Sequence, residues 1–68
     1  MVNVSSEAIA TVNYDTDSGT MSVGFTDGTL YVYSDVPEAV YVDLITASSI
    51  GGYFNKNVRD AYSYTQLY

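Results

Sequence analysis

The segment FTDGTLYVYS, residues 25–34, joins two runs of alternating apolar residues through Asp27-Gly28. An Asp-Gly pair between two such runs is typical of the two-residue turn of a β-hairpin. With a two-residue turn, Thr26 pairs with Thr29, and the register of every later pair follows. The stretch therefore predicts two antiparallel strands and also which side chains share a face of the sheet.

The predicted register divides the strand residues between the two faces. Tyr31 and Tyr33 would lie on one face, over Gly24 and Ser22, where their rings are free to contact a partner. The alternative is that both rings are structural, since tyrosine is a common strand residue and a helix or a tail can cover it. A shift of one residue in the turn would exchange the two faces. We expect the other face to be apolar and covered by a helix, with Ala10, Val12, Tyr14, Met21, Val23, Phe25, Leu30 and Val32.

The rest of the chain predicts an α+β domain, a single unit over residues 1–68. Alternation predicts a three-stranded antiparallel meander with strands near 9–14, 20–26 and 29–34. A helix is expected over 37–48, because a proline suits its first turn and apolar residues recur along one stripe. A short second helix is expected within SSIGGYFNKNVRDAY, and the final SYTQLY is either a strand or a docked tail.

A chain of 68 residues builds only a small core, and such domains often need a further source of stability. The sequence contains no cysteine and no histidine, which excludes disulfides and zinc–thiolate sites. The third predicted strand, TLYVYS, has no lysine or proline that would protect an exposed edge. We therefore expect a homodimer in which this edge pairs with a second copy.

Eight acidic residues against two basic ones give a net charge of −6. Such a surface repels phosphate backbones, so extended nucleic acid is disfavoured as a partner. The first ten residues lack a basic start with a long apolar run, and no stretch is long enough to span a membrane. The sequence thus predicts a cytoplasmic protein, in the host cytoplasm if a phage encodes it, without a membrane partner.

The sequence offers little for catalysis, because the usual pairs of base and nucleophile need histidine or cysteine. Asp35, Glu38 and Asp43 are close in sequence, but they suit a helix start and a solvated face. The segment DTDSG at 15–19 resembles the opening of a calcium loop, yet its glycine comes one place early and the bidentate glutamate is missing. We expect no enzyme activity, no metal site and no cofactor.

Both cationic side chains lie in NKNVR, residues 55–59, close to Tyr53. Arg59 can hold a carboxylate or a phosphate with its planar fork, and Asn55 can add hydrogen bonds. With aromatic rings nearby, this group suits a small nucleotide whose base stacks and whose phosphate meets the cations. The alternative is that both cations pair with surface carboxylates. We predict a ligand-binding surface made of Tyr31, Tyr33, Tyr53, Asn55, Lys56 and Arg59.

Three segments, in this order and spacing, resemble the KTSC domain: SSEAIATVNYD, GTLYVYSDVPEAVY and ASSIGGYFNKNVRDAY. They cover most of the chain, so a single KTSC-like domain is expected over 1–68. The resemblance implies a small module that occurs at the C-terminus of some lysyl-tRNA synthetases and as a stand-alone protein in bacteria and phages. It implies no established function, and RNA binding is a suggestion tied to the synthetase context.

From these observations we favour a non-catalytic interaction module that recognises a protein or a small ligand through the tyrosine-rich surface. One alternative is a phage-type inhibitor of a bacterial defence system, which acts as an acidic mimic of nucleic acid or sequesters a nucleotide signal. Another alternative is an RNA-binding accessory domain, as the resemblance suggests, although the acidic charge argues against extended RNA.

Overall fold

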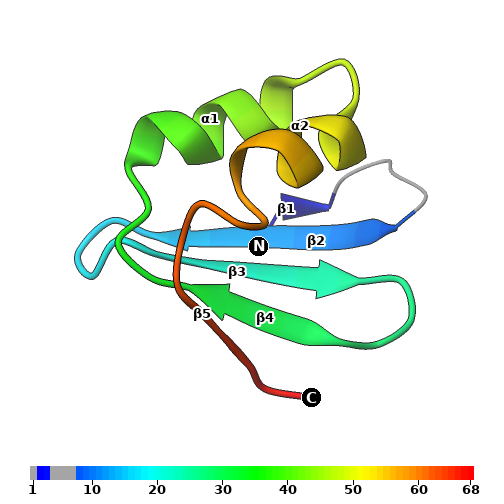
Figure 1. The fold of residues 1–68 in the computed structure, drawn as a ribbon, viewed down its shortest axis with the longest axis horizontal. Coiled ribbons are helices and arrows are strands. Elements are labelled where there is room, and N and C mark those ends of the chain that lie inside the picture. Colours follow the sequence, from blue (N-terminus) through cyan, green and yellow to red (C-terminus); the bar gives the residue numbers. More distant parts are fainter. Residues whose placement is uncertain (1, 4–7) are drawn as a thin grey trace.

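The computed structural model describes residues 2–3 and 8–68 and shows two helices packed on one face of an antiparallel sheet (Figure 1). The sheet has five strands in the order β1-β2-β3-β4-β5, so each strand pairs with its neighbours along the chain. The α+β class is confirmed, but the count of three strands is wrong because β1 and β5 extend the meander at its two edges. The elements are β1 Val2–Asn3, β2 Ile9–Asp15, β3 Thr20–Phe25, β4 Leu30–Tyr33, α1 Glu38–Thr46, α2 Ile50–Asn57 and β5 Tyr64–Gln66.

The register of the first hairpin, between β2 and β3, is the predicted one. Tyr14 lies opposite Met21, and Val12 lies opposite Val23. Val12, Met21 and Val23 are fully buried, as expected for residues on a face that a helix covers. The alternation of apolar residues therefore predicts this pair of strands correctly.

An irregularity near the start of β2 changes one core residue. The register shifts between Ile9 and Thr11, so that Ile9 lies opposite Phe25 in the place predicted for Ala10. Ile9 is only 1% exposed. A bulge in one strand thus brings a larger apolar side chain into the core than strict alternation would.

The turn of the second hairpin, between β3 and β4, contains three residues rather than two, so its predicted register is wrong. The N–H of Phe25 donates to the carbonyl oxygen of Thr29 at 2.9 Å, and the N–H of Gly28 donates to that of Phe25 at 3.0 Å. Gly28 has a φ of 93°, which suits the glycine that closes a three-residue hairpin loop. Asp27 stabilises the loop, because its Oδ1 accepts hydrogen bonds from the N–H and the hydroxyl of Thr29 at 3.0 and 2.7 Å. The extra loop residue shifts the pairing of β3 with β4 by one position.

The shifted register turns the tyrosines of β4 toward the helices. Tyr33 lies opposite the buried Met21, and Tyr31 lies two residues away on the same face. The prediction that Tyr31 and Tyr33 point away from the helix-covered face is therefore wrong. Leu30 and Val32, which were expected in the core, point to the uncovered face instead.

The two predicted helices are confirmed, and α1 is shorter than the expected 37–48. Leu44 of α1 is fully buried, and Phe54 of α2 is 4% exposed. Ser49 caps α2, since its Oγ accepts a hydrogen bond from the N–H of Gly52 at 3.2 Å. Within residues 2–3 and 8–68, neither helix has the length and apolar character that crossing a bilayer requires. The core consists of Ile9, Val12, Met21, Val23, Tyr33, Val36, Leu44, Phe54 and Val58.

The C-terminal segment forms β5 and pairs antiparallel with β4. Tyr64 lies opposite Tyr33, and Thr65 lies opposite Val32. The prediction that β4 is a free edge is wrong, because β5 occupies that edge within the same chain. The outer edge of the sheet on this side is β5 itself (Figure 1).

Candidate functional site

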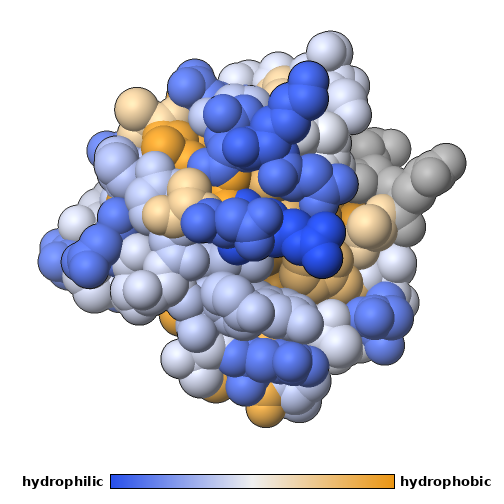
Figure 2. All heavy atoms as spheres, viewed as in Figure 1, coloured by the Kyte–Doolittle hydropathy of each residue, from blue (hydrophilic) through white to orange (hydrophobic). Residues whose placement is uncertain are grey.

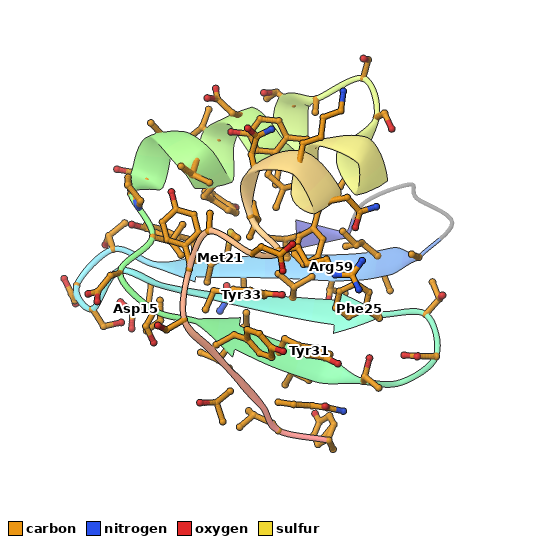
Figure 3. The ribbon with its side chains drawn as sticks, in the orientation of Figure 1. Asp15, Met21, Phe25, Tyr31, Tyr33 and Arg59 are labelled. Carbon is orange, nitrogen blue, oxygen red and sulfur yellow. The ribbon has the colours of Figure 1, made fainter. Side chains whose placement is uncertain are left out.

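A cleft of about 450 Å³ opens on the covered face, between the β3–β4–β5 side of the sheet and the end of α2. Phe25, Tyr31 and Tyr33 come from the sheet, and Arg59 extends over this region from the segment that follows α2 (Figure 3). On this side of the molecule, hydrophilic side chains lie directly beside neutral and hydrophobic ones (Figure 2). The cleft is lined by Ala8, Phe25, Asp27, Thr29, Tyr31, Tyr33, Phe54, Asn55, Arg59, Asp60 and Tyr64.

Tyr33 forms the floor of the cleft. Its side chain is 2% exposed, and its ring centroid lies 5.6 Å from that of Phe54 and 5.4 Å from that of Tyr64. The rings of Tyr33 and Phe54 meet at 82°, the edge-to-face geometry that aromatic pairs prefer. Phe54 thus packs α2 against the sheet beside the cleft.

The hydroxyl of Tyr33 remains available although the ring is buried. It has no hydrogen-bond partner among residues 2–3 and 8–68. In that part of the chain, every side-chain oxygen that is fully shut off from solvent does have a partner. The oxygen therefore reaches the cleft. Burial raises the pKa of Tyr33 to about 12, with Tyr64 and Tyr31 acting in the same direction and Arg59 against it. At neutral pH the floor of the cleft consequently presents a neutral hydroxyl that can donate a hydrogen bond.

Half-exposed aromatic rings form the walls. The ring centroid of Tyr31 lies 5.4 Å from that of Phe25 and 5.3 Å from that of Tyr64. Tyr64 is 54% exposed and stands at the outer strand of the sheet. These faces and edges can contact the ring of a planar ligand.

The rim of the cleft carries the polar and charged groups. The N–H groups of Val58 and Arg59 both donate to the carbonyl oxygen of Phe54, at 3.0 and 2.9 Å, so the chain turns sharply at the end of α2. Arg59 and Asn55 are exposed at this end of the helix. Within the described part of the chain, no carboxylate lies within ion-pair distance of Arg59. The alternative, in which Arg59 pairs with a surface carboxylate, is therefore not observed among these residues.

Two carboxylates share the lining with Arg59. The hydroxyl of Thr29, followed by its backbone N–H, lowers the pKa of Asp27 by hydrogen bonding. Asp27 is thus already engaged in its own loop. Asp60 follows Arg59 directly and lies on the same lining. The charged rim therefore offers one cation beside two anions, a setting that disfavours ligands with several negative charges.

The structure brings four of the six predicted site residues together around the cleft: Tyr31, Tyr33, Asn55 and Arg59. Tyr53 and Lys56 belong to α2 but do not line the cleft. Burial raises the pKa of Tyr53, with Asp43 and then Tyr62 adding to the effect, and its partly buried ring packs against the core. Lys56 is exposed on the last turn of α2.

Several lining residues were not predicted. Phe25 was expected in the core, Phe54 was not assigned to the site, and Tyr64 lay in a segment predicted as either a strand or a docked tail. Asp60 adjoins Arg59 in sequence, and that adjacency was the one signal that could have identified it. Among residues 2–3 and 8–68, no group of three or more acidic side chains could hold a metal ion.

Comparison with known proteins identifies relatives over most of the chain. The sequence matches the KTSC domain over residues 5–62. A protein from Tsukamurella paurometabola is 37% identical over 59 residues, which cover 87% of this chain and 88% of the relative. A lysine–tRNA ligase from Nostoc punctiforme is 34% identical over 55 residues, which cover 81% of this chain but only 10% of the ligase.

The fold is also that of a solved structure. The crystal structure of a KTSC domain protein from Yersinia pestis matches with a TM-score of 0.92 at 26% identity and covers 98% of this chain and 94% of that one. The resemblance inferred from the three sequence segments is therefore confirmed.

Proposed function

Because the chain belongs to the KTSC domain family, we propose that it is a non-catalytic interaction module that binds a small ligand in the aromatic cleft. The observation that carries the proposal is the position of Arg59. A guanidinium without a carboxylate partner in the described part of the chain stands at the mouth of a cleft walled by tyrosines. A volume of about 450 Å³ lies within the range of small-molecule sites.

The lining favours a planar ring that bears one anionic group. Tyr31 and Tyr64 offer surfaces for the ring, Arg59 can hold a carboxylate or phosphate, and the hydroxyl of Tyr33 can donate from the floor. Asp27 and Asp60 would repel further phosphate groups beyond the one that Arg59 holds. A nucleoside monophosphate fits this description better than a polyphosphate.

Binding without chemistry follows from the groups present. The chain has no histidine and no cysteine, so the usual general base and thiol nucleophile are missing. Tyr33, whose pKa burial raises to about 12, stays protonated at neutral pH and does not act as a base there.

The test is a titration of the protein with adenosine monophosphate, followed by NMR shifts and calorimetry, with adenosine as the control that lacks the anion. Arg59→Gln should lower the affinity for the monophosphate by about tenfold or more, because a charge-assisted hydrogen bond is lost. Lys56→Gln is the matched control, because it removes the same charge from an exposed residue outside the cleft. Equal losses for the two variants, or no binding at all, would overturn the proposal.

A second candidate, binding to single-stranded RNA, is favoured by one observation, the relative that is a lysine–tRNA ligase. In this case the cleft would take one unpaired base and Arg59 an adjoining phosphate. Titrating a short RNA at two salt concentrations separates the candidates. The affinity for RNA should fall steeply as the salt concentration rises, whereas the affinity for a mononucleotide should change little.

A further inference from the structure

Two opposite charges stand next to each other on the rim of the cleft without pairing. Arg59 and Asp60 are consecutive residues on the turn that follows α2, and both line the cleft. Hydrogen bonds fix this turn, since the N–H of Arg59 donates to the carbonyl oxygen of Phe54 at 2.9 Å and the N–H of Ala61 donates to that of Val58 at 3.1 Å. In this described segment no ion pair joins the two charged side chains. The guanidinium and the carboxylate are therefore both available to a ligand.

Both charges act on the floor of the cleft. Burial raises the pKa of Tyr33 to about 12, and after the neighbouring tyrosines Arg59 lowers this pKa while Asp60 raises it. Asp27, the other carboxylate of the lining, lies on the β3–β4 loop and already accepts two hydrogen bonds from Thr29. Asp60 is thus the carboxylate that stands beside Arg59 at the Tyr33 end of the cleft.

We propose that the cleft selects a ligand whose planar ring carries an ammonium as well as an anionic group, and that an aromatic α-amino acid is the simplest member of this class. Its carboxylate binds Arg59, its ammonium binds Asp60, and its ring lies against the aromatic walls. An α-amino acid suits two adjacent side chains because its ammonium and its carboxylate are bonded to the same carbon atom. This ligand class rests on the proposed function, because it keeps the places of the ring and the anion and adds a contact to Asp60.

Charge favours this class over ligands with one kind of charge. The protein carries a net charge of −6, which favours a ligand that includes a cation. A purely anionic ligand would be repelled by Asp60, and a purely cationic ligand would be repelled by Arg59. A zwitterion gives each of the two side chains an opposite charge.

The experiment compares L-tryptophan with two analogues that share its indole ring. Indole-3-propionate lacks the ammonium, and tryptamine lacks the carboxylate. Calorimetry and NMR titration of the unmodified protein should show that tryptophan binds about threefold to fivefold more tightly than indole-3-propionate, the effect of one solvent-exposed ion pair. Tryptamine should also bind more weakly than tryptophan. Equal affinities for tryptophan and either analogue would overturn the inference.

Asp60→Asn provides a test with opposite signs. It should lower the affinity for tryptophan by about threefold but leave the affinity for indole-3-propionate unchanged or higher, because it removes an attraction to the ammonium and a repulsion of the carboxylate. Asp17→Asn is the matched control, since it removes the same charge from an exposed residue of the β2–β3 turn, outside the cleft. A loss of affinity for both ligands in Asp60→Asn, or an equal loss for tryptophan in Asp17→Asn, would contradict the contact to Asp60.

Adenosine monophosphate separates failure of this inference from failure of the proposed function. Its binding should depend on Arg59 and should not weaken in Asp60→Asn, because it brings no ammonium. If adenosine monophosphate or indole-3-propionate binds and Arg59→Gln weakens it, while tryptophan gains nothing over its analogue, the inference fails and the proposed function stands. If none of these ligands binds, both fail.

Discussion

Two pairs of tyrosines lie on the covered face of the sheet, and they differ in what surrounds them. Tyr14 and Tyr41 stack at 5.2 Å with an angle of 15° between β2 and α1, and the hydroxyl of Tyr14 donates to the carbonyl oxygen of Val36 at 2.6 Å. Tyr31 and Tyr64 lie at nearly the same distance, 5.3 Å, but are tilted by 48°. Their hydroxyls form no hydrogen bond within residues 2–3 and 8–68.

The difference shows that cover, rather than residue type, separates a structural tyrosine from one that can meet a ligand. α1 closes over Tyr14, and the backbone carbonyl of Val36 accepts the hydrogen bond of its hydroxyl. α2 reaches Tyr33 through Phe54 but leaves Tyr31 and Tyr64 at the wall of the cleft. Substitutions at these tyrosines test the contrast.

Tyr33→Ala should lower the free energy of unfolding by about 3–5 kcal/mol, because it removes a buried aromatic ring from the centre of the core. Tyr31→Ala, at a half-buried ring, should lose about 1–2 kcal/mol. Urea unfolding of both variants measures the difference. Tyr33→Leu keeps part of the core volume and replaces the alanine variant in this experiment if the alanine variant does not fold. Equal losses at the two positions would show that Tyr31 is as well packed as Tyr33.

Tyr14→Phe should cost about 1 kcal/mol of stability, since it leaves the carbonyl of Val36 without its donor. Tyr64→Phe should change stability by less than about 0.5 kcal/mol, as for an exposed position without a bonded hydroxyl. The same urea experiment compares them. A larger loss for Tyr64→Phe would reveal a hydrogen bond to its hydroxyl and would end the contrast between the two pairs.

The stability of the protein should fall between about pH 10 and pH 12. Tyr33 is neutral when protonated, and its pKa is raised from 10.0 in a free side chain to about 12 in the folded state. The folded state is therefore favoured fully below pH 10, and this contribution is lost as the pH rises through 12. Free energies of unfolding at pH 8 and pH 11 measure the loss, and Tyr33→Phe should remove the part that comes from this hydroxyl. An unchanged loss in the variant would assign it to other tyrosines.

The sequence predicts the elements of this fold better than their register. The same letters, TDGT, suit a two-residue Asp-Gly turn and a three-residue loop that ends in Gly28, and both give a hairpin. The choice between them depends on how the β4 residues pack under the helices, which is a tertiary effect. One loop residue is enough to move Tyr31 and Tyr33 from one face to the other.

The candidate site shows the same limit. Asn55 and Arg59 were predicted together because both lie in the short segment NKNVR, and local sequence decides their position. Tyr64 reaches the cleft only because β5 pairs with β4, and both helices separate these two strands in the sequence. No local pattern indicates such a long-range contact. The cluster of aromatic rings around Tyr33 is therefore visible only in the folded chain.

The connection from β4 through α1 and α2 to β5 also sets an order of events during synthesis. The hairpins of β2, β3 and β4 use contacts between neighbouring segments and can form while the nascent chain is still growing. β5 pairs with β4 across the longest loop between neighbouring strands, so its docking comes last. We expect a variant truncated before residue 64 to keep helices and hairpins yet lack one wall of the cleft, so that ligand recognition would depend on the strand that pairs last.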